Sequence, residues 1–230
     1  MFQFKQFSVS DDQCAHPVGT DGVLLGAWAR VEGCRRVLDI GTGSGLIALM
    51  VAQRCPQASV TGIDIDPSSV AQARENVARS PFASQIAIEE RDVKDFHTEE
   101  PFDAILCNPP FFTETTLSPD HRRAQARHAA LLPFPDLLGS VCRLLSVDGT
   151  FHVILPCQSD NDFINQAFMV GLNVIRQCQI RTVGRKPPRR MLLSFSRVGK
   201  VSLATEQLIL QDGEGGRTEE YAELTRNFYL

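Results

Sequence analysis

"VLDIGTGSGL", residues 37–46, decides the fold of this chain. Its first half completes a short apolar strand, predicted at 36–40, and its second half opens a helix, predicted at 44–53 with Ser44 as its cap. Three glycines occupy alternate positions where the strand passes into the helix: Gly41, Gly43 and Gly45. Glycine allows a tight turn and a close approach to a ligand, and the first N–H groups of a helix are free to bind one. The stretch therefore predicts a ligand-binding turn between a strand and a helix.

The alternation of strand and helix continues along the chain. Further strands are predicted at 59–63, 86–90, 104–107 and 151–155. Further helices are predicted at 20–29, 67–79, 134–146 and 160–170. Two β-rich segments, 173–182 and 190–197, predict a hairpin. Strands that alternate with helices form a parallel sheet with helices on both faces, so we expect an α/β fold whose mostly parallel, seven-stranded sheet carries an antiparallel edge hairpin.

Composition excludes several classes of protein. The 230 residues suit one large domain, and no apolar run reaches the roughly 18 residues that a membrane span needs. The N-terminus has no signal-peptide pattern, so we expect a cytoplasmic protein without a membrane partner. The seven cysteines are scattered without a CxxC, and the five histidines lack ligand spacing. A disulfide framework, a metal site and a metal hydrolase are therefore disfavoured.

The net charge of −4 is not typical of a nucleic-acid-binding protein. Two basic clusters nevertheless occur, at residues 121–128 and 181–190. Each is also compatible with a solvated surface loop, so charge alone does not decide whether RNA is a partner.

Two aspartates follow the neighbouring predicted strands. Asp64 ends the second strand, where a carboxylate can accept hydrogen bonds from both hydroxyls of a ribose. Asp92 follows the third strand and could meet an adenine amino group. Leu46 stands where a GxGxxG fingerprint needs its third glycine, so binding of a dinucleotide diphosphate is disfavoured. The pattern favours a nucleoside ligand, while helix capping alone remains the other interpretation of these acids.

A second motif, "LCNPPFF" at residues 106–112, ends a buried strand abruptly. Pro109 and Pro110 have no N–H for the sheet, so the strand stops at Asn108 in a fixed shape. A turn that merely terminates the strand is the alternative explanation, and the glycine turn and the two aspartates elsewhere in the chain disfavour it.

Together, GTGSG, GIDID and NPPF resemble the motifs of class I S-adenosylmethionine-dependent methyltransferases that act on amino groups. The resemblance spans residues from about 15 to 198 and implies a Rossmann-like fold and S-adenosylmethionine as cofactor. It also implies a set of cofactor-binding residues: Thr20, Asp21, Asp39, Gly41, Gly43, Gly45, Asp64, Ile65, Asp92, Val93 and Asn108.

The resemblance gives NPPF a catalytic role. An amino group on an aromatic ring is a poor nucleophile, because its lone pair is delocalised. Two acceptors aimed at its hydrogens, the Asn108 side chain and the Pro109 carbonyl, would free that lone pair. Pro110 would help to fix these acceptors in advance, and Phe111 would stack on the target group.

Three further segments narrow the resemblance: VGTDGVLLGAWA, HRRAQARHAALLPF and GRKPPRRMLLSF. They resemble bacterial tRNA adenine-N6 methyltransferases, which modify the adenine beside the anticodon of a valine tRNA. That family leads us to expect a Lys before VGTD, where His16-Pro17 stands here. The resemblance implies tRNA as partner and a set of RNA-binding residues: Arg122, Arg123, Arg127, Lys186, Arg189 and Arg190.

Other functions remain open at this stage. A release-factor glutamine methyltransferase usually has an added N-terminal helical domain and Tyr after NPP, whereas an rRNA amino-methyltransferase and a non-catalytic RNA-binding module would share this fold. We expect a monomeric, single-domain protein in which residues 1–35 cap a catalytic core at 36–198 and residues 199–230 form an extension.

Overall fold

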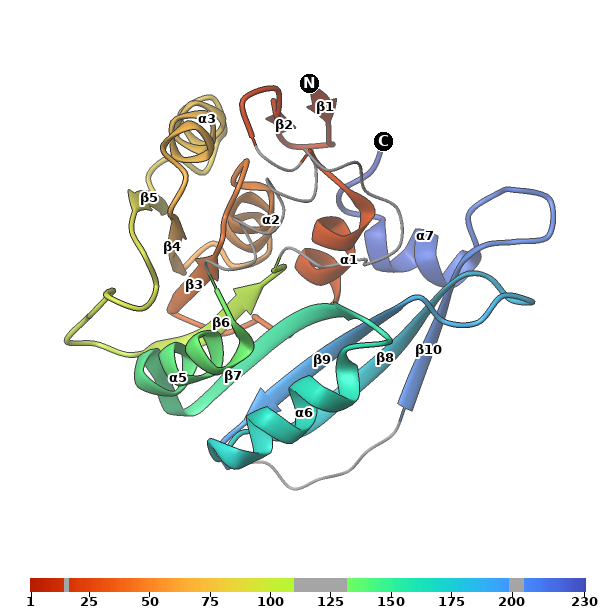
Figure 1. Cartoon of the computed structure of the whole chain (residues 1–230). Helices are drawn as coiled ribbons and strands as arrows, with labels where there is room; N and C mark the ends of the chain where they lie inside the picture. The colour runs from red at the N-terminus through yellow and green to blue at the C-terminus, as the bar shows by residue number, and fades with distance from the viewer. Residues whose placement is uncertain (15–16, 110–131, 199–204) are drawn as a thin grey trace, which may run out of the picture.

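The computed structural model describes residues 1–14, 17–109, 132–198 and 205–230, and its main feature is an eight-stranded sheet (Figure 1). The strand order is β10-β8-β9-β7-β6-β3-β4-β5. β9 runs antiparallel to both of its neighbours, and every other neighbouring pair is parallel. The predicted α/β fold class, with its mostly parallel sheet and antiparallel hairpin, is confirmed.

The elements follow one another along the chain much as predicted. The strands are β1 (Phe2–Gln3), β2 (Ser8–Val9), β3 (Arg36–Ile40), β4 (Ser59–Asp64), β5 (Ile86–Glu90), β6 (Phe102–Cys107), β7 (Leu145–Pro156), β8 (Asn173–Val183), β9 (Arg190–Ser196) and β10 (Thr205–Gln211). The helices are α1 (Thr20–Trp28), α2 (Leu46–Arg54), α3 (Pro67–Ala78), α5 (Phe134–Leu144), α6 (Asp160–Met169) and α7 (Glu219–Thr225).

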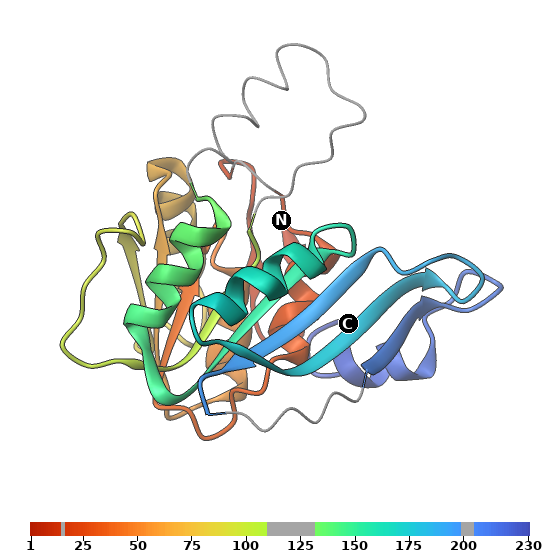
Figure 2. The ribbon, with the colours of Figure 1, turned by 60° about the horizontal axis from the view of Figure 1, so that its bottom comes forward.

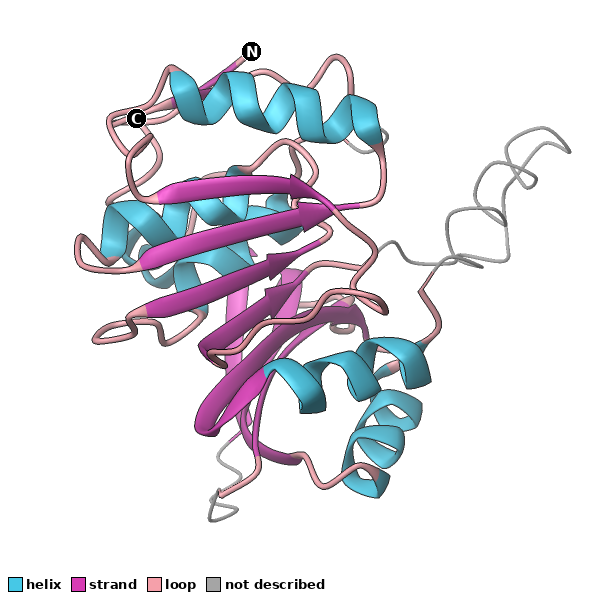
Figure 3. Cartoon of the chain, turned by 90° about the vertical axis from the view of Figure 1, so that its left-hand side faces the viewer, coloured by secondary structure: helices cyan, strands magenta, loops and turns pink. Residues whose placement is uncertain are grey.

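Helices cover both faces of the sheet, as Figure 3 shows. Successive residues of a central strand therefore belong to different cores. Val37 of β3 packs in the cluster that includes α1, α2 and α3, whereas Leu38 packs in the cluster that includes α5 and α6. In β6, Ala104 packs in the first of these clusters and Ile105 in the second. Strands buried on both faces form continuous apolar runs, which is why these segments lack polar alternation.

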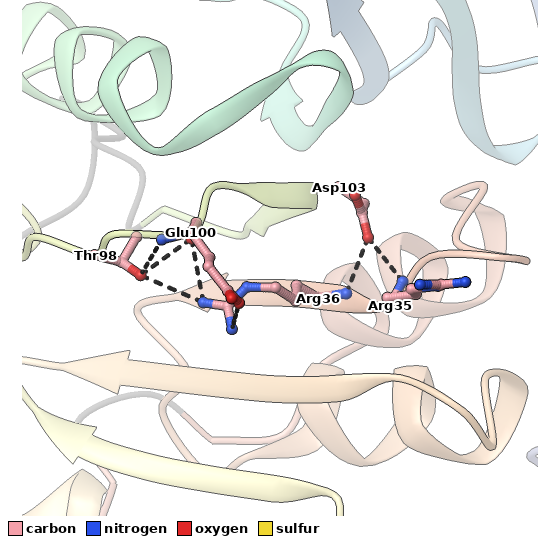
Figure 4. A network of polar contacts seen from close by, with 5 residues as sticks. All are labelled: Arg35, Arg36, Thr98, Glu100 and Asp103. Carbon is pink, nitrogen blue, oxygen red and sulfur yellow. Dashed lines mark hydrogen bonds and ion pairs between the residues drawn. The ribbon is translucent and has the colours of Figure 1, made fainter.

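The amino ends of β3 and β6 are joined by polar contacts, at the opposite end of β3 from the glycine turn (Figure 4). Asp103 Oδ2 accepts hydrogen bonds from the backbone N–H groups of Arg35 and Arg36, at 2.7 and 3.0 Å. The Arg36 guanidinium also donates to the Glu100 carbonyl at 3.2 Å and pairs with its carboxylate at 3.1 Å. These contacts support the register in which Val37 pairs with Ala104.

Two local predictions are wrong. The cap of α2 is Gly45 at φ 81°, with no side-chain hydrogen bond, because the Ser44 carbonyl is held by Asn76 Nδ2 at 2.8 Å and the turn enters the helix through the glycine. β7 begins at Leu145, directly after α5, rather than at 151. A Cβ added at Gly149 would lie 3.0 Å from the Asp103 carbonyl oxygen, so this glycine permits β7 to approach β6 closely.

The C-terminal extension adds an eighth strand that the sequence analysis did not include. β10 pairs in parallel with β8, so the hairpin of β8 and β9 lies inside the sheet and not at its edge (Figure 2). α7 follows, with Tyr221 and Phe228 buried in the main core. The two ends of the chain also meet, because the Lys5 N–H donates to the Phe228 carbonyl at 2.9 Å. The division into one domain with an extension stays a prediction.

Candidate active site

The carboxyl ends of the parallel strands β3, β4, β5 and β6 lie at one edge of the sheet, and the segments that follow them enclose a cavity. Its volume is about 600 Å³, within the range of about 300–1,000 Å³ that is usual for ligand pockets. α1 contributes its first turn to the wall, and β9 contributes Arg190. Open α/β sheets bind ligands at this position.

The glycine turn forms one wall of the cavity. Gly41 has φ 69° and Gly43 φ 54°, conformations that residues with a Cβ rarely adopt. A Cβ added at either position would meet nothing within 4 Å, so the backbone is open to a ligand. Gly45 differs, because its added Cβ would lie 3.4 Å from Ala73 and the residue does not line the cavity. The third glycine lets the start of α2 lie close to Ala73 of α3.

Asp64 lies beside this turn at the end of β4. Its Oδ2 accepts a hydrogen bond from the Gly43 N–H at 2.9 Å, and its Oδ1 accepts one from the Asp66 N–H at 3.0 Å. A carboxylate has about four lone-pair sites, so two remain for a ligand. Asp64 therefore shapes the glycine turn and is also able to receive two hydroxyl groups from the cavity.

Asp39 was predicted as a cofactor-binding residue, but the structure places it beneath the turn. Its side chain is fully buried, is absent from the cavity wall, and accepts a hydrogen bond from Thr42 Oγ1 at 2.7 Å. Burial raises the pKa of Asp39 to about 7. A role in holding the turn fits this position better than contact with a ligand.

The end of β6 forms the opposite wall. Asn108 is half-buried, Pro109 is buried, and both line the cavity. A Cβ added at Gly22 of α1 would lie 4.0 Å from Asn108 Nδ2, so the amide lies against α1. Pro110 and Phe111 lie outside the described residues.

A second predicted pair comes together from distant parts of the chain. Arg190 Nε donates to Asp21 Oδ2 at 2.7 Å, although the two residues are 169 positions apart. Both line the cavity, where Asp21 was predicted to contact the cofactor and Arg190 the RNA. Lys186 and Arg189 are exposed between β8 and β9. Arg122, Arg123, Arg127 and His16 lie outside the described residues.

Most of the predicted residues within the described ranges line this cavity: Thr20, Asp21, Gly41, Gly43, Asp64, Ile65, Asp92, Val93, Asn108, Pro109 and Arg190. Arg91, which directly precedes Asp92, also lines the cavity and was not among the predicted residues. Its position directly after the strand predicted at 86–90 was the signal that could have identified it as a cavity residue.

S-adenosylmethionine fits the residues that are present. The open glycine turn admits a ligand close to the backbone, and Asp64 has lone pairs for two ribose hydroxyls. The lining includes four carboxylates, from Asp21, Asp64, Asp66 and Asp92, against the two guanidinium groups of Arg91 and Arg190. A cationic sulfonium is therefore favoured over a diphosphate.

Fold and cavity together define the class as a Rossmann-like, S-adenosylmethionine-dependent methyltransferase. The family model described as methyltransferase small domain matches residues 22–130. Proteins named tRNA1(Val) (adenine(37)-N6)-methyltransferase from Phocaeicola vulgatus and Bacteroides thetaiotaomicron are 45% and 43% identical to this chain, covering 100% of it and 97% of each relative. The corresponding protein of Shewanella amazonensis is 43% identical, covering 100% of this chain and 98% of the relative. The chain belongs to the tRNA1(Val) (adenine(37)-N6)-methyltransferase family.

Solved structures agree on the fold. A protein from Agrobacterium tumefaciens described as an O-methyltransferase superposes with a TM-score of 0.72 at 20% identity, covering 90% of this chain and 96% of the other. A ribosomal protein L11 methylase from Lactobacillus delbrueckii gives 0.57 at 21% identity, covering 81% and 83%. The predicted class, enzymatic activity and cofactor are confirmed by the family.

Across 1–14, 17–109, 132–198 and 205–230, no group of three His, Cys, Asp or Glu side chains is arranged to hold a metal ion. Each helix within the same ranges is too short or too polar to span a lipid bilayer.

Proposed function

We propose that this protein transfers a methyl group from S-adenosylmethionine to N6 of the adenine beside the anticodon of a valine tRNA, position 37. The observation that carries the proposal is the placement of Asn108 and Pro109 in the same cavity as the glycine turn and Asp64. The names of its full-length relatives support the choice of tRNA adenine as substrate. A cytoplasmic location and a monomeric state are parts of the same proposal.

The cofactor supplies an electrophilic methyl group on a sulfonium when it is bound. Gly41 and Gly43 would leave room for it, and Asp64 would hold its ribose. Asp92 lies at the same cavity, where it would accept a hydrogen bond from an adenine amino group. Holding both reactants in contact is worth on the order of 7–11 kcal/mol of the barrier.

Asn108 and Pro109 act on the nucleophile. The Asn108 side-chain oxygen and the Pro109 carbonyl accept hydrogen bonds from the two hydrogens of the target amino group, which localises its lone pair. Pro109 is buried, so its carbonyl is fixed before the substrate arrives. Such preorganised groups cost no rearrangement at the moment of reaction.

The test is methyl transfer by the purified protein. We would incubate it with labelled S-adenosylmethionine and unmodified valine tRNA, then digest the RNA and identify the methylated nucleoside by mass spectrometry. N6-methyladenosine at position 37 is expected, and it should disappear when that adenine is replaced by guanosine.

Parallel reactions with ribosomal RNA and a release factor test the other substrates. Label only in the release factor would overturn the RNA assignment. Methylcytidine or methylguanosine in the tRNA would overturn only the choice of adenine and would leave the tRNA assignment standing. Absence of label in every substrate, with intact cofactor binding, would favour a non-catalytic RNA-binding module.

A further inference from the structure

A second cavity lies beside the first, and no function described above uses it. Its volume is about 510 Å³, again within the usual range of about 300–1,000 Å³ for ligand pockets. Thr20, Asp21 and Arg190 line both cavities, so the first turn of α1 and the start of β9 form a shared wall. A ligand in the second cavity would therefore lie next to a ligand in the first.

The C-terminal extension builds the far side of this second cavity. Leu210 and Gln211 come from the end of β10, Gly215 and Arg217 from the following turn, and Tyr221 from α7. Gly215 has φ 91°, and a Cβ added there would meet nothing within 4 Å, so the turn presents open backbone. Because β10 pairs with β8, the extension lies against the sheet at this point and supplies one wall of the cavity.

The charge of the lining is positive. It includes the guanidinium groups of Arg189, Arg190 and Arg217 and one carboxylate, from Asp21. Arg190 forms an ion pair with Asp21 at 2.7 Å. Within the described residues, the ion pairs include neither Arg189 nor Arg217. Both are exposed, and the Arg217 guanidinium lies 4.2 Å from the centre of the Tyr229 ring. Such a guanidinium is suited to a phosphate, which it binds with two parallel hydrogen bonds.

The remaining lining suits a nucleoside more than a bare phosphate. Leu24, Ile180 and Leu210 give an apolar side, while Thr182 and Gln211 add hydroxyl and amide groups able to bond a sugar or a base edge. An apolar side with a few polar groups is the usual composition of a pocket for an organic ligand.

We propose that the second cavity binds the nucleotide adjacent to the target adenine in single-stranded RNA, with Arg217 and Arg189 on its phosphate. This inference rests on the proposed function, because an adenine in the first cavity places its neighbour at the shared wall. Loop nucleotides are already unstacked, so two consecutive residues of an anticodon loop separate at low cost. The Asp21–Arg190 ion pair lies between the target adenine and its neighbouring nucleotide and positions both.

The test compares Arg217→Ala with Arg226→Ala in the full chain. Arg226 carries the same charge in the same extension but lines neither cavity, and its side chain is exposed beside Glu223. We expect Arg217→Ala to raise KM for the tRNA about tenfold, with kcat and S-adenosylhomocysteine affinity unchanged. The thermal midpoint should fall only slightly, because the contact with the Tyr229 ring is lost. The log–log salt slope of RNA binding should fall by about 0.7, the value for one phosphate contact with a single strand. Arg226→Ala should leave all five quantities at their wild-type values.

Two further measurements test whether the charge of Arg217 is what binds the RNA and whether the neighbouring nucleotide lies in the second cavity. Arg217→Lys should retain most of the RNA affinity and the full salt slope, because it keeps the charge. An anticodon stem-loop with photoreactive 4-thiouridine on one side of the target adenine, and a second with it on the other side, should crosslink from one side to residues 205–221.

Failure of the inference is distinct from failure of the proposed function. Suppose that wild-type protein methylates the tRNA. If Arg217→Ala then behaves like Arg226→Ala, or if Arg217→Lys binds RNA as weakly as Arg217→Ala, only the assignment of the second cavity is overturned. Crosslinks from neither side to residues 205–221 overturn it as well. If wild-type protein transfers no methyl group to tRNA, the proposed function and this inference both fall.

Discussion

Replacing Asp64 by Ala should separate the two roles of this carboxylate. Asp64 accepts backbone hydrogen bonds from Gly43 and Asp66, at 2.9 and 3.0 Å, and it faces the cavity. A hydrogen bond to a charged group contributes about 1.5–3 kcal/mol, but the site is half-buried and water replaces part of each bond. We therefore expect Asp64→Ala to lower the free energy of unfolding by about 1–3 kcal/mol, or roughly 2–12 °C in thermal midpoint.

The same variant should also lose cofactor affinity. Two ribose hydroxyls would lose their acceptor, and a loss of about 1–3 kcal/mol corresponds to roughly 5–150-fold in Kd. Calorimetric titration with S-adenosylhomocysteine measures this directly, below the thermal midpoint of the variant. A thermal melt without ligand measures the effect on stability separately.

Asp103→Ala is the matched control. Asp103 is also half-buried and also accepts two backbone hydrogen bonds, from Arg35 and Arg36, but it lies at the amino end of the sheet and lines neither cavity (Figure 4). The Asp103→Ala variant should lose about as much free energy of unfolding as Asp64→Ala, and its cofactor affinity should not change. If Asp64→Ala is destabilised but binds S-adenosylhomocysteine like the control, the assignment of Asp64 to the ribose is refuted.

Three further predictions address the turn, the motif and the buried carboxyl. Asn108→Ala should lower kcat by about 10²–10³-fold with little change in cofactor Kd or thermal midpoint, and normal turnover would contradict its catalytic role. Gly43→Ala should cost about 1–2 kcal/mol of stability through its positive φ and also weaken cofactor binding. Gly33→Ala, at φ 83° with equally open space, should cost similar stability and leave binding unchanged, so equal affinities in the two variants would show that the turn does not contact the cofactor. Burial raises the pKa of Asp39 to about 7. The neutral Asp39 carboxyl should therefore contribute its full share of the free energy of unfolding below its unfolded pKa of about 4, and that share should be lost as the pH rises through about 7. Asp39→Asn should remove that part of the pH dependence, and an unchanged profile in melts between pH 4 and 8 would disprove it.

Local patterns determined much of this protein from sequence alone. β3, the glycine turn and α3 depend on neighbours a few residues away, through backbone conformation, hydrogen bonding and apolar spacing. Parallel strands then carry their carboxyl ends to one edge, which is why Asp64 and Asn108 line one cavity as expected. The errors at Ser44 and at the start of β7 arose where a local pattern competed with a contact from elsewhere in the chain, from Asn76 and Asp103.

Only the tertiary structure decided how the C-terminal extension is used. β10 joins β8, and Trp28 Nε1 donates to Glu206 Oε2 at 3.0 Å across 178 positions of the chain. The Asp21–Arg190 pair spans 169 positions, and it turns a predicted cofactor residue and a predicted RNA residue into neighbours. Contacts at such separations depend on how the whole sheet packs, and no periodicity or motif in either partner encodes them. The first cavity could therefore be expected from the sequence, whereas the second, with Arg217 in its wall, could be found only in the folded chain.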